Sequence, residues 1–313
     1  MRNLLYIVNP ISGTSNKFSL KEVITARTVA AGFKFDIYPS VADGDYSFLD
    51  EVIKEKKYTD IILAGGDGTV NQGINALRKH NLPFGILPSG SGNGLAFSAG
   101  IPKATASALN VVFNGKSEWT DGFSVNSQFA CMLCGFGFDA QVAHDFSKGT
   151  KRGLMTYTKK VMQQFFSSVT YPFVLKIGDN ELQVEAYFIS IANSNQFGNH
   201  FTIAPRASLT DGLLDIVIMT RQSKLNMILQ TVLQVAGLNR LQKIEDLNKQ
   251  MGVVYFQTDK VSIANKRLAP LHIDGEPVES LEHLDIKILP KNFRLIFPQK
   301  HFGSIKSLPF SAL

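Results

Sequence analysis

The first 114 residues alternate short apolar segments with helical patterns, and this alternation limits the folds open to the chain more than any other feature. Strands separated by helices of this length predict a parallel sheet with right-handed helical crossovers. The predicted strands are Leu4–Val8, Phe33–Tyr38, Asp60–Ala64 and Phe84–Leu87. The predicted helices are Lys17–Ala31, Tyr46–Lys56, Thr69–Lys79, Gly92–Ala99 and Ala104–Asn114.

The pattern changes near Asp121, where segments of period two become dominant. Alternating strands bounded by Gly, Asn and Asp are typical of an antiparallel sandwich or barrel. The predicted strands are Ser124–Leu133, Pro172–Ile177, Leu182–Ala192, Leu214–Thr220, Gly252–Thr258, Lys260–Ala264 and Leu284–Ile288. Helical patterns interrupt them at Ala140–Phe146, Leu154–Ser168 and Lys224–Leu241. We therefore predict an α/β domain followed by a β-rich domain with inserted helices, divided within residues 115–125.

The composition fits a two-domain globular protein. A length of 313 residues favours two domains, and 44% hydrophobic with 19% charged residues excludes wholesale disorder. Two cysteines exclude a disulfide-stapled scaffold. The sequence has neither a signal-peptide pattern nor an apolar run of about 18 residues, so a cytoplasmic location is expected. The net charge of +6 permits anionic partners without selecting one.

Three loops rich in small residues follow predicted strands, at the sheet edge where parallel-sheet proteins bind ligands. They are Asn9–Ser15, Gly65–Thr69 and Pro88–Gly94. Taken alone, the first is better explained by helix capping, and the third is equally explained by a flexible loop. The glycines of the second point to backbone amides and a helix N-terminus that bind an anion. Together the loops predict one amide-rich surface suited to a polyphosphate.

Asp67 lies among the glycines of the second loop. A carboxylate beside a phosphate site would repel the ligand unless Mg²⁺ or a proton transfer is involved. Asp67 is therefore a candidate general base or metal-linked group. The loops match neither the P-loop motif nor the dinucleotide fingerprint, because no Lys follows the glycines and G-x-G-x-x-G is missing after the first strand.

At these residues the sequence resembles the diacylglycerol kinase catalytic-domain family, which includes bacterial lipid kinases, sphingosine kinases and ceramide kinases. The first loop matches N-P-x-S-G, the second matches G-G-D-G-T-x-N-[EQ], and the third is similar to the sphingosine-kinase form P-x-G-S-G-N-x-L-A. The resemblance continues along nearly the whole chain. Its later matches are Gly135–Ala140, Asp211–Asp215 and Ile273–Glu276.

The resemblance implies two domains, with ATP and lipid meeting in the cleft between them. The first would be a Rossmann-like parallel-sheet domain similar to that of NAD kinases and phosphofructokinases, formed by residues 1–121 and a returning segment, 299–313. The second would be an antiparallel β-sandwich that binds the lipid, formed by residues 122–298. The implied activity is ATP- and Mg²⁺-dependent phosphorylation of a lipid hydroxyl on diacylglycerol, a sphingoid base or a related lipid.

Site residues follow from the same resemblance. Asp67 and Glu276 are the expected catalytic pair, and which of them is the base stays open. Asp121 matches an acid at the interdomain cleft, and Asp211 with the backbone carbonyl of Leu213 matches a peripheral Mg²⁺ site. The expected ATP-binding residues are Asn9, Ser12, Gly13, Thr14, Gly65, Gly66, Gly68, Thr69, Ser89, Gly90, Ser91, Gly92 and Asn93.

Three positions depart from the family pattern. Gly94 stands where many bacterial members have Asp, Gln72 where Glu is usual, and Thr14 where a basic residue is common. The substrate class therefore stays open. Two alternatives also stay open, which are a kinase for NAD or another small molecule and a catalytically silent nucleotide- or lipid-binding regulator.

Two side-chain clusters bear on partners. The basic cluster at positions 148–160 is read most simply as a solvated helix face, and alternatively as a contact for anionic lipid headgroups. Peripheral attachment to an anionic membrane is therefore expected, nucleic acid is not, and a homodimer is left open. The phenylalanines of the second cluster predict core packing, and some of them an acyl-chain tunnel. The basic residues are Lys148, Lys151, Arg152, Lys159 and Lys160, and the apolar ones are Phe136, Phe138, Phe146, Met155, Phe165 and Phe166.

Overall fold

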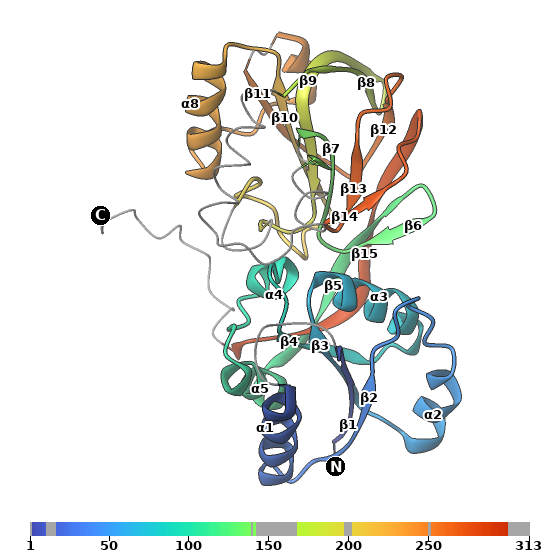
Figure 1. Ribbon diagram of the computed structural model, residues 1–313. Coiled ribbons are helices and arrows are strands. Elements are labelled where there is room, and N and C mark those ends of the chain that lie inside the picture. The colour runs from blue at the N-terminus through green and yellow to red at the C-terminus, as the bar shows by residue number, and fades with distance from the viewer. Residues whose placement is uncertain are drawn as a thin grey trace, which may run out of the picture.

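A computed structural model gives the structure of the chain (Figure 1). It describes residues 2–10, 17–138, 140–141, 168–196, 202–249 and 252–299. Four parallel strands open the fold in the spatial order β4-β3-β1-β2. Every residue of β3 is buried, as expected for a strand covered on both faces. The strands are β1 (Asn3–Val8), β2 (Lys34–Pro39), β3 (Asp60–Gly65) and β4 (Pro83–Pro88).

Helices lie on both sides of these strands, with α1 and α5 together on one side and α2 and α3 on the other (Figure 1). Their bounds agree with the sequence prediction to within three residues. The largest difference is at α2, which begins at Leu49 because Asp43 and Asp45 first hydrogen-bond the backbone and form turns. The helices are α1 (Lys17–Ala30), α2 (Leu49–Lys56), α3 (Asp67–Leu77), α4 (Gly94–Ser98) and α5 (Thr105–Asn114), with a 3₁₀ turn, η1 (Arg78–His80).

The rest of the described chain is dominated by antiparallel strands that enclose a second hydrophobic core. Phe123, Phe136, Phe173 and Phe256 are among its buried side chains. The predicted fold class is confirmed: parallel N-terminal strands precede an antiparallel β-sandwich. The strands are β5 (Lys116–Val125), β6 (Gln128–Ala130), β7 (Leu133–Gly137), β8 (Tyr171–Ile177), β9 (Asn180–Ala192), β10 (Leu214–Thr220), β11 (Val253–Thr258), β12 (Lys260–Ala264), β13 (Leu271–Ile273), β14 (Glu276–Val278) and β15 (His283–Phe297). The helical elements are α8 (Lys224–Val235) and the 3₁₀ segment η2 (Ile244–Lys249).

Strand β15 joins the antiparallel strands to the parallel strands in one continuous sheet. It pairs antiparallel with β12 and β5, and near its end it pairs parallel with β4 at Arg294 and Leu295. The predicted strand ends at Ile288, whereas β15 continues to Phe297. The difference lies where the register of β15 shifts beyond Leu289 and Lys291 adopts a positive φ of 50°. Such an irregularity interrupts the period-two pattern without ending the strand.

The predicted strand Ser124–Leu133 is wrong as a single element. The chain turns at Asn126, which has a φ of 52°, and divides into β5, β6 and β7. Strand β5 also runs without a break across position 121, and the exact domain boundary stays a prediction.

Several predictions fall on residues that the structure does not describe. These are the helix at Ala140–Phe146 beyond residue 141, the helix at Leu154–Ser168 before Ser168, the basic cluster at 148–160, and the returning segment beyond residue 299. Among the helices in the described ranges, none is both long and apolar enough to cross a bilayer.

Candidate active site

The three predicted loops meet at the carboxyl ends of β1, β3 and β4. The Asn9 backbone N–H donates to the carbonyl of Ala64 at 2.9 Å, and the Ser89 N–H donates to the carbonyl of Gly65 at 3.0 Å. The Asn9 side-chain amide donates to Thr69 Oγ1 at 2.7 Å. The described parts of the loops therefore form one surface, while Ser12, Gly13 and Thr14 lie outside the described residues.

Gly66 and Gly90 bring the second and third loops into backbone contact. A Cβ added to Gly90 would lie 2.4 Å from the Gly66 Cα, which leaves no room for a side chain. The third loop is also held internally, because the Asn93 side chain accepts from the Gly90 N–H at 2.9 Å and donates to the Gly90 carbonyl at 2.8 Å. This loop, with Ser91 and Gly92 at its tip, is thus a fixed turn next to the second loop.

Replacing Gly90 with Ala is expected to weaken binding of ATP, the ligand predicted from the sequence, by about tenfold. The added methyl group would push the third loop away from Gly66, because the obstacle is backbone rather than a movable side chain. Isothermal titration calorimetry measures this change. The control is Gly178→Ala in the turn between β8 and β9, where an added Cβ meets nothing within 4 Å and the φ of 58° costs stability without touching the loops. Equal affinities of the two variants would contradict the prediction.

Asp67, the first residue of α3, joins the second loop to the start of α4. Its carboxylate accepts hydrogen bonds from the backbone N–H groups of Asn93, Gly94 and Leu95. Asp67 retains a small exposed surface, but burial of its carboxylate raises its pKa to about 6. The negative charge of Asp274 raises this pKa further, and the three backbone amides lower it. The carboxylate of Asp67 therefore faces the backbone N–H groups at the start of α4.

The raised pKa of Asp67 predicts a pH dependence of stability. The folded protein holds this proton between about pH 4 and pH 6, where the unfolded chain has released it, so Asp67 lowers the free energy of unfolding as pH rises through that window. The loss amounts to roughly 3 kcal/mol for a rise of the pKa from its usual value of 3.8 to about 6. Urea denaturation of wild type and Asp67→Asn measures the free energy of unfolding of each. The difference between the two free energies should change by this amount from pH 4 to pH 7. A difference independent of pH would contradict the prediction.

Glu276 reaches the same place from the β-sandwich. It begins β14, after a tight turn in which Asp274 and Gly275 have φ values of 49° and 84°. Glu276 is exposed, and its Oε1 lies 3.1 Å from the position that a Cβ on Gly68 would occupy. Glu276 thus approaches Gly68, the residue that follows Asp67 in the first turn of α3, although Asp67 and Glu276 are 209 positions apart in the sequence.

A buried hydrogen-bond network holds the Glu276 hairpin against α3. The Asn71 side-chain amide on α3 donates to Asp274 Oδ2 at 2.6 Å, and the backbone N–H groups of Cys131, Met132 and Leu133 each donate to this carboxylate at 2.9 Å. Asp274 is 6% exposed. We call the contact between the α3 amide and the hairpin carboxylate the Asn71–Asp274 latch. Sequence reasoning gave neither residue a role, although both belong to the quoted motifs.

Asp121, expected at the interdomain cleft, binds two backbone N–H groups. Its Oδ1 accepts from the Lys291 N–H at 2.7 Å and its Oδ2 from the Gly212 N–H at 2.8 Å. Asp121 is 2% exposed, so its carboxylate fixes the irregular part of β15 to the loop before β10. The place of Asp121 at an interdomain cleft stays a prediction.

Asp211 lies on the same loop, where its Oδ1 accepts from the Leu213 N–H at 3.1 Å. Burial raises the pKa of Asp211, and the charge of Asp121 adds to the rise. Among the described residues, no group of three or more His, Cys, Asp or Glu side chains is arranged to hold a metal ion. The Asp211 carboxylate and the Leu213 carbonyl are oxygen donors of the type Mg²⁺ prefers, and Mg²⁺ commonly keeps several waters, so the donor types fit a peripheral ion.

The two departures from the family motifs in the described residues have defined surroundings. The Gly94 N–H donates to Asp67, and the aliphatic part of Gln72 lies 3.2 Å from the position that a Cβ on Gly44 would occupy. Gln72 therefore packs against the loop before α2, whereas Gly94 belongs to the turn that holds Asp67.

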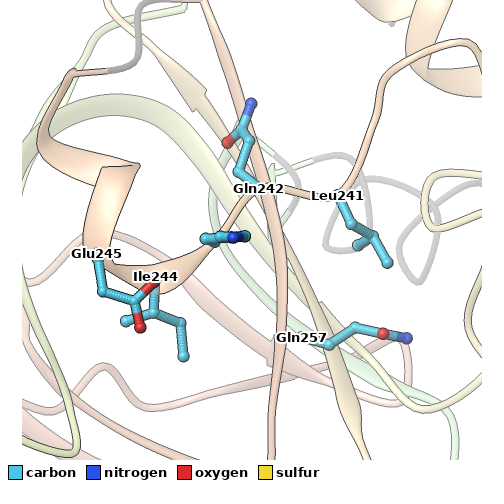
Figure 2. Close-up of a pocket in the computed structure, with 6 residues that line it drawn as sticks. Leu241, Gln242, Ile244, Glu245 and Gln257 are labelled. Atoms are coloured by element: carbon cyan, nitrogen blue, oxygen red, sulfur yellow. The ribbon is translucent and has the colours of Figure 1, made fainter.

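A separate open cavity of about 480 Å³ lies in the β-sandwich (Figure 2). Figure 2 shows Ile244 and Glu245 on η2 and Gln257 on β11 around it. None of the site residues predicted from the sequence lines this cavity. Its lining residues are Leu241, Gln242, Lys243, Ile244, Glu245 and Gln257.

Comparison with protein-family models gives two matches that together span most of the chain. The model of the diacylglycerol kinase catalytic domain matches residues 3–125. The model described as the YegS C-terminal NAD kinase beta sandwich-like domain matches residues 133–297. The two matches correspond to the parallel-sheet part and to the β-sandwich part described above.

Individual proteins agree with these matches. The chain is 28% identical over 274 residues to a protein of Chromohalobacter salexigens named "Probable lipid kinase YegS-like", with 85% of each chain covered. It is 26% identical over 282 residues to a diacylglycerol kinase of Bacillus subtilis, covering 88% of this chain and 90% of the relative. A solved structure described as a diacylglycerol kinase of Bacillus anthracis shares the fold, with a TM-score of 0.71, 21% identity, and coverage of 95% of this chain and 97% of that chain.

Proposed function

The chain belongs to the diacylglycerol kinase catalytic-domain family, and from this membership we propose that it is an ATP- and Mg²⁺-dependent lipid kinase. The observation that carries the proposal is the approach of Glu276 to the first turn of α3, beside Asp67 and the glycine-rich loops. Phosphoryl transfer needs positioning and charge stabilisation more than covalent chemistry by the protein. This arrangement supplies an acceptor for a proton next to a surface for phosphates.

The backbone amides of the three loops would bind the phosphates of ATP. The N-terminus of α3 adds a favourable dipole for an anion at Gly66, Gly68 and Thr69. When bound, Mg²⁺ would supply further neutralisation of phosphate charge, and Asp211 with the Leu213 carbonyl would hold a peripheral ion. Ser89, Gly90 and Asn93 would keep the third loop in place against Gly66.

We assign the role of base to Glu276. Glu276 is exposed, whereas the carboxylate of Asp67 is largely buried against the backbone amides at the start of α4. Glu276 would accept the proton of the lipid hydroxyl as the hydroxyl oxygen forms a bond to the γ-phosphorus. The bond between that phosphorus and the bridging oxygen of ATP breaks, and ADP leaves with the electron pair. Asp67 then acts as the residue that fixes the third loop to α3.

Incubation with ATP labelled at the γ-phosphate, Mg²⁺ and a panel of acceptors tests the proposal. The panel contains diacylglycerol, monoacylglycerol, sphingosine, ceramide and NAD. We expect the label in an organic-phase lipid product, and the lipid labelled fastest identifies the substrate class that Gly94 and Gln72 leave open. Label in no lipid, or label in NADP alone, would refute the proposed activity.

A further inference from the structure

Helix α8 carries apolar side chains on its solvent face. Leu225, Leu229 and Val232 are 82%, 54% and 59% exposed, and their spacing of four and three residues places them on one face of the helix. Met227 and Gln234, seven residues apart, are buried on the opposite face. An ordinary surface helix has apolar residues inside and polar residues outside, so this pattern is reversed over part of α8.

The buried face fixes α8 to the rest of the β-sandwich. Met227 is 1% exposed and belongs to a hydrophobic core, and the Gln234 amide donates to the carbonyl of Ile203 at 2.9 Å. Ser223 caps the helix by accepting from the Asn226 N–H. Leu238, just beyond the helix, is 67% exposed. We call the four exposed side chains Leu225, Leu229, Val232 and Leu238 the α8 ridge; Figure 1 places α8 at the periphery of the molecule.

All charged residues in the segment that carries the α8 ridge are positive. No Asp or Glu occurs between Asp215 and Glu245, and this stretch contains Arg221, Lys224, Arg240 and Lys243. Arg221 forms an ion pair with Glu185 at 2.9 Å, and Lys224 lies over the ring of Tyr187 at 4.1 Å. Arg240 and Lys243, beyond the end of the helix, are exposed. The ridge is therefore flanked by cations and free of acids along its own segment.

We propose that the α8 ridge inserts into the surface of a bilayer that contains anionic lipids and thereby docks the protein where its substrate lies. Apolar side chains that project from a helix, with cations beside them, match the boundary between acyl chains and anionic headgroups. A symmetric dimer formed through the ridge would instead bring two sets of cations together. The choice of a lipid surface as partner rests on the proposed function.

Flotation with vesicles, carried out without ATP, tests the docking surface. The vesicles contain phosphatidylcholine alone or phosphatidylcholine with about one third phosphatidylglycerol. The test variant combines Leu225→Gln and Leu229→Gln. The matched control is Val29→Gln, because Val29 is an apolar residue of α1 that is 63% exposed. Since all three side chains are exposed, both variants should melt as wild type does, which circular dichroism checks.

Wild type and control should bind the anionic vesicles. The double variant should bind them with an affinity at least about tenfold lower. Binding should also weaken at high salt and on pure phosphatidylcholine. Equal binding by the double variant and the control would overturn the proposal. So would a wild-type dimer that the double variant dissociates in analytical ultracentrifugation, because the ridge would then be a contact between two copies.

Activity on a water-soluble short-chain diacylglycerol separates this proposal from the proposed function. If wild type phosphorylates the soluble lipid and binds neither vesicle, the docking proposal fails and the kinase assignment stands. If wild type binds vesicles through α8 and phosphorylates no lipid, the docking surface stands and the kinase assignment fails. Loss of activity by the double variant on vesicles, with activity on the soluble lipid retained, supports both.

Discussion

Replacing Glu276 with Gln should lower kcat for lipid phosphorylation by about 10²- to 10⁴-fold, the range that a positioned general base contributes. The amide is similar in size to the carboxylate and cannot accept the proton of the lipid hydroxyl. The affinity for ATP should stay unchanged, because the three loops and the turn around Asp67 do not depend on this side chain. Steady-state kinetics with the preferred lipid and calorimetry with ATP measure the two quantities separately.

Glu279→Gln is the matched control for this substitution. Glu279 is an exposed acid directly after β14, so its replacement changes the net charge equally on the same hairpin. We expect the control to keep wild-type kcat. Full activity of Glu276→Gln would remove Glu276 from the catalytic role and leave Asp67 as the candidate base.

Replacing Asp274 with Ala should destabilise the protein by about 3–5 kcal/mol, because it leaves several buried donors without an acceptor. The orphaned groups would be the Asn71 amide and the N–H groups of Cys131, Met132 and Leu133. Urea denaturation at pH 7 measures the loss. Asp259→Ala is the control, since Asp259 is an exposed acid of the same domain, and it should change stability by less than about 0.5 kcal/mol.

The latch can be separated from folding with Asn71→Ala, which removes one donor and leaves Asp274 bonded to three backbone amides. If the latch positions Glu276, this variant lowers kcat for the lipid while its affinity for ATP stays at the wild-type value. An Asn71→Ala protein with unchanged kcat would limit Asp274 to a structural role.

The parallel strands and their loops could be predicted from the sequence because their signals are local. Apolar runs such as Asp60–Ala64 are buried as whole strands, and the glycines after them form turns within a few residues. The second half of β15 could not be predicted, because Lys291 interrupts the alternating pattern and its support comes from Asp121, which is distant in the sequence. The strands β13 and β14 could not be predicted for another reason, because each is only three residues long and too short to show an alternating pattern. The Asp274-Gly275 turn between them is itself a hairpin signal.

The candidate site could be predicted in part. Asp67 stood out among glycines, while Glu276 was found only through the family resemblance, since a glutamate after an Asp-Gly turn is an ordinary hairpin residue. The latch was missed because the role of Asp274 depends on its burial and on four donors from two other segments. Burial of a single acid is a property of the assembled fold, and no local pattern marks it.

The pairing of β5 with β15 determines how the two parts of the molecule can move. The two strands form an antiparallel ribbon that extends from the β-sandwich to the parallel sheet, where β15 pairs with β4. If the two parts move relative to each other while these pairings are kept, this ribbon bends. The bend would fall at the register shift near Lys291, which Asp121 holds by one hydrogen bond. For the proposed kinase, we expect the stiffness of this two-stranded ribbon to influence substrate entry and product release.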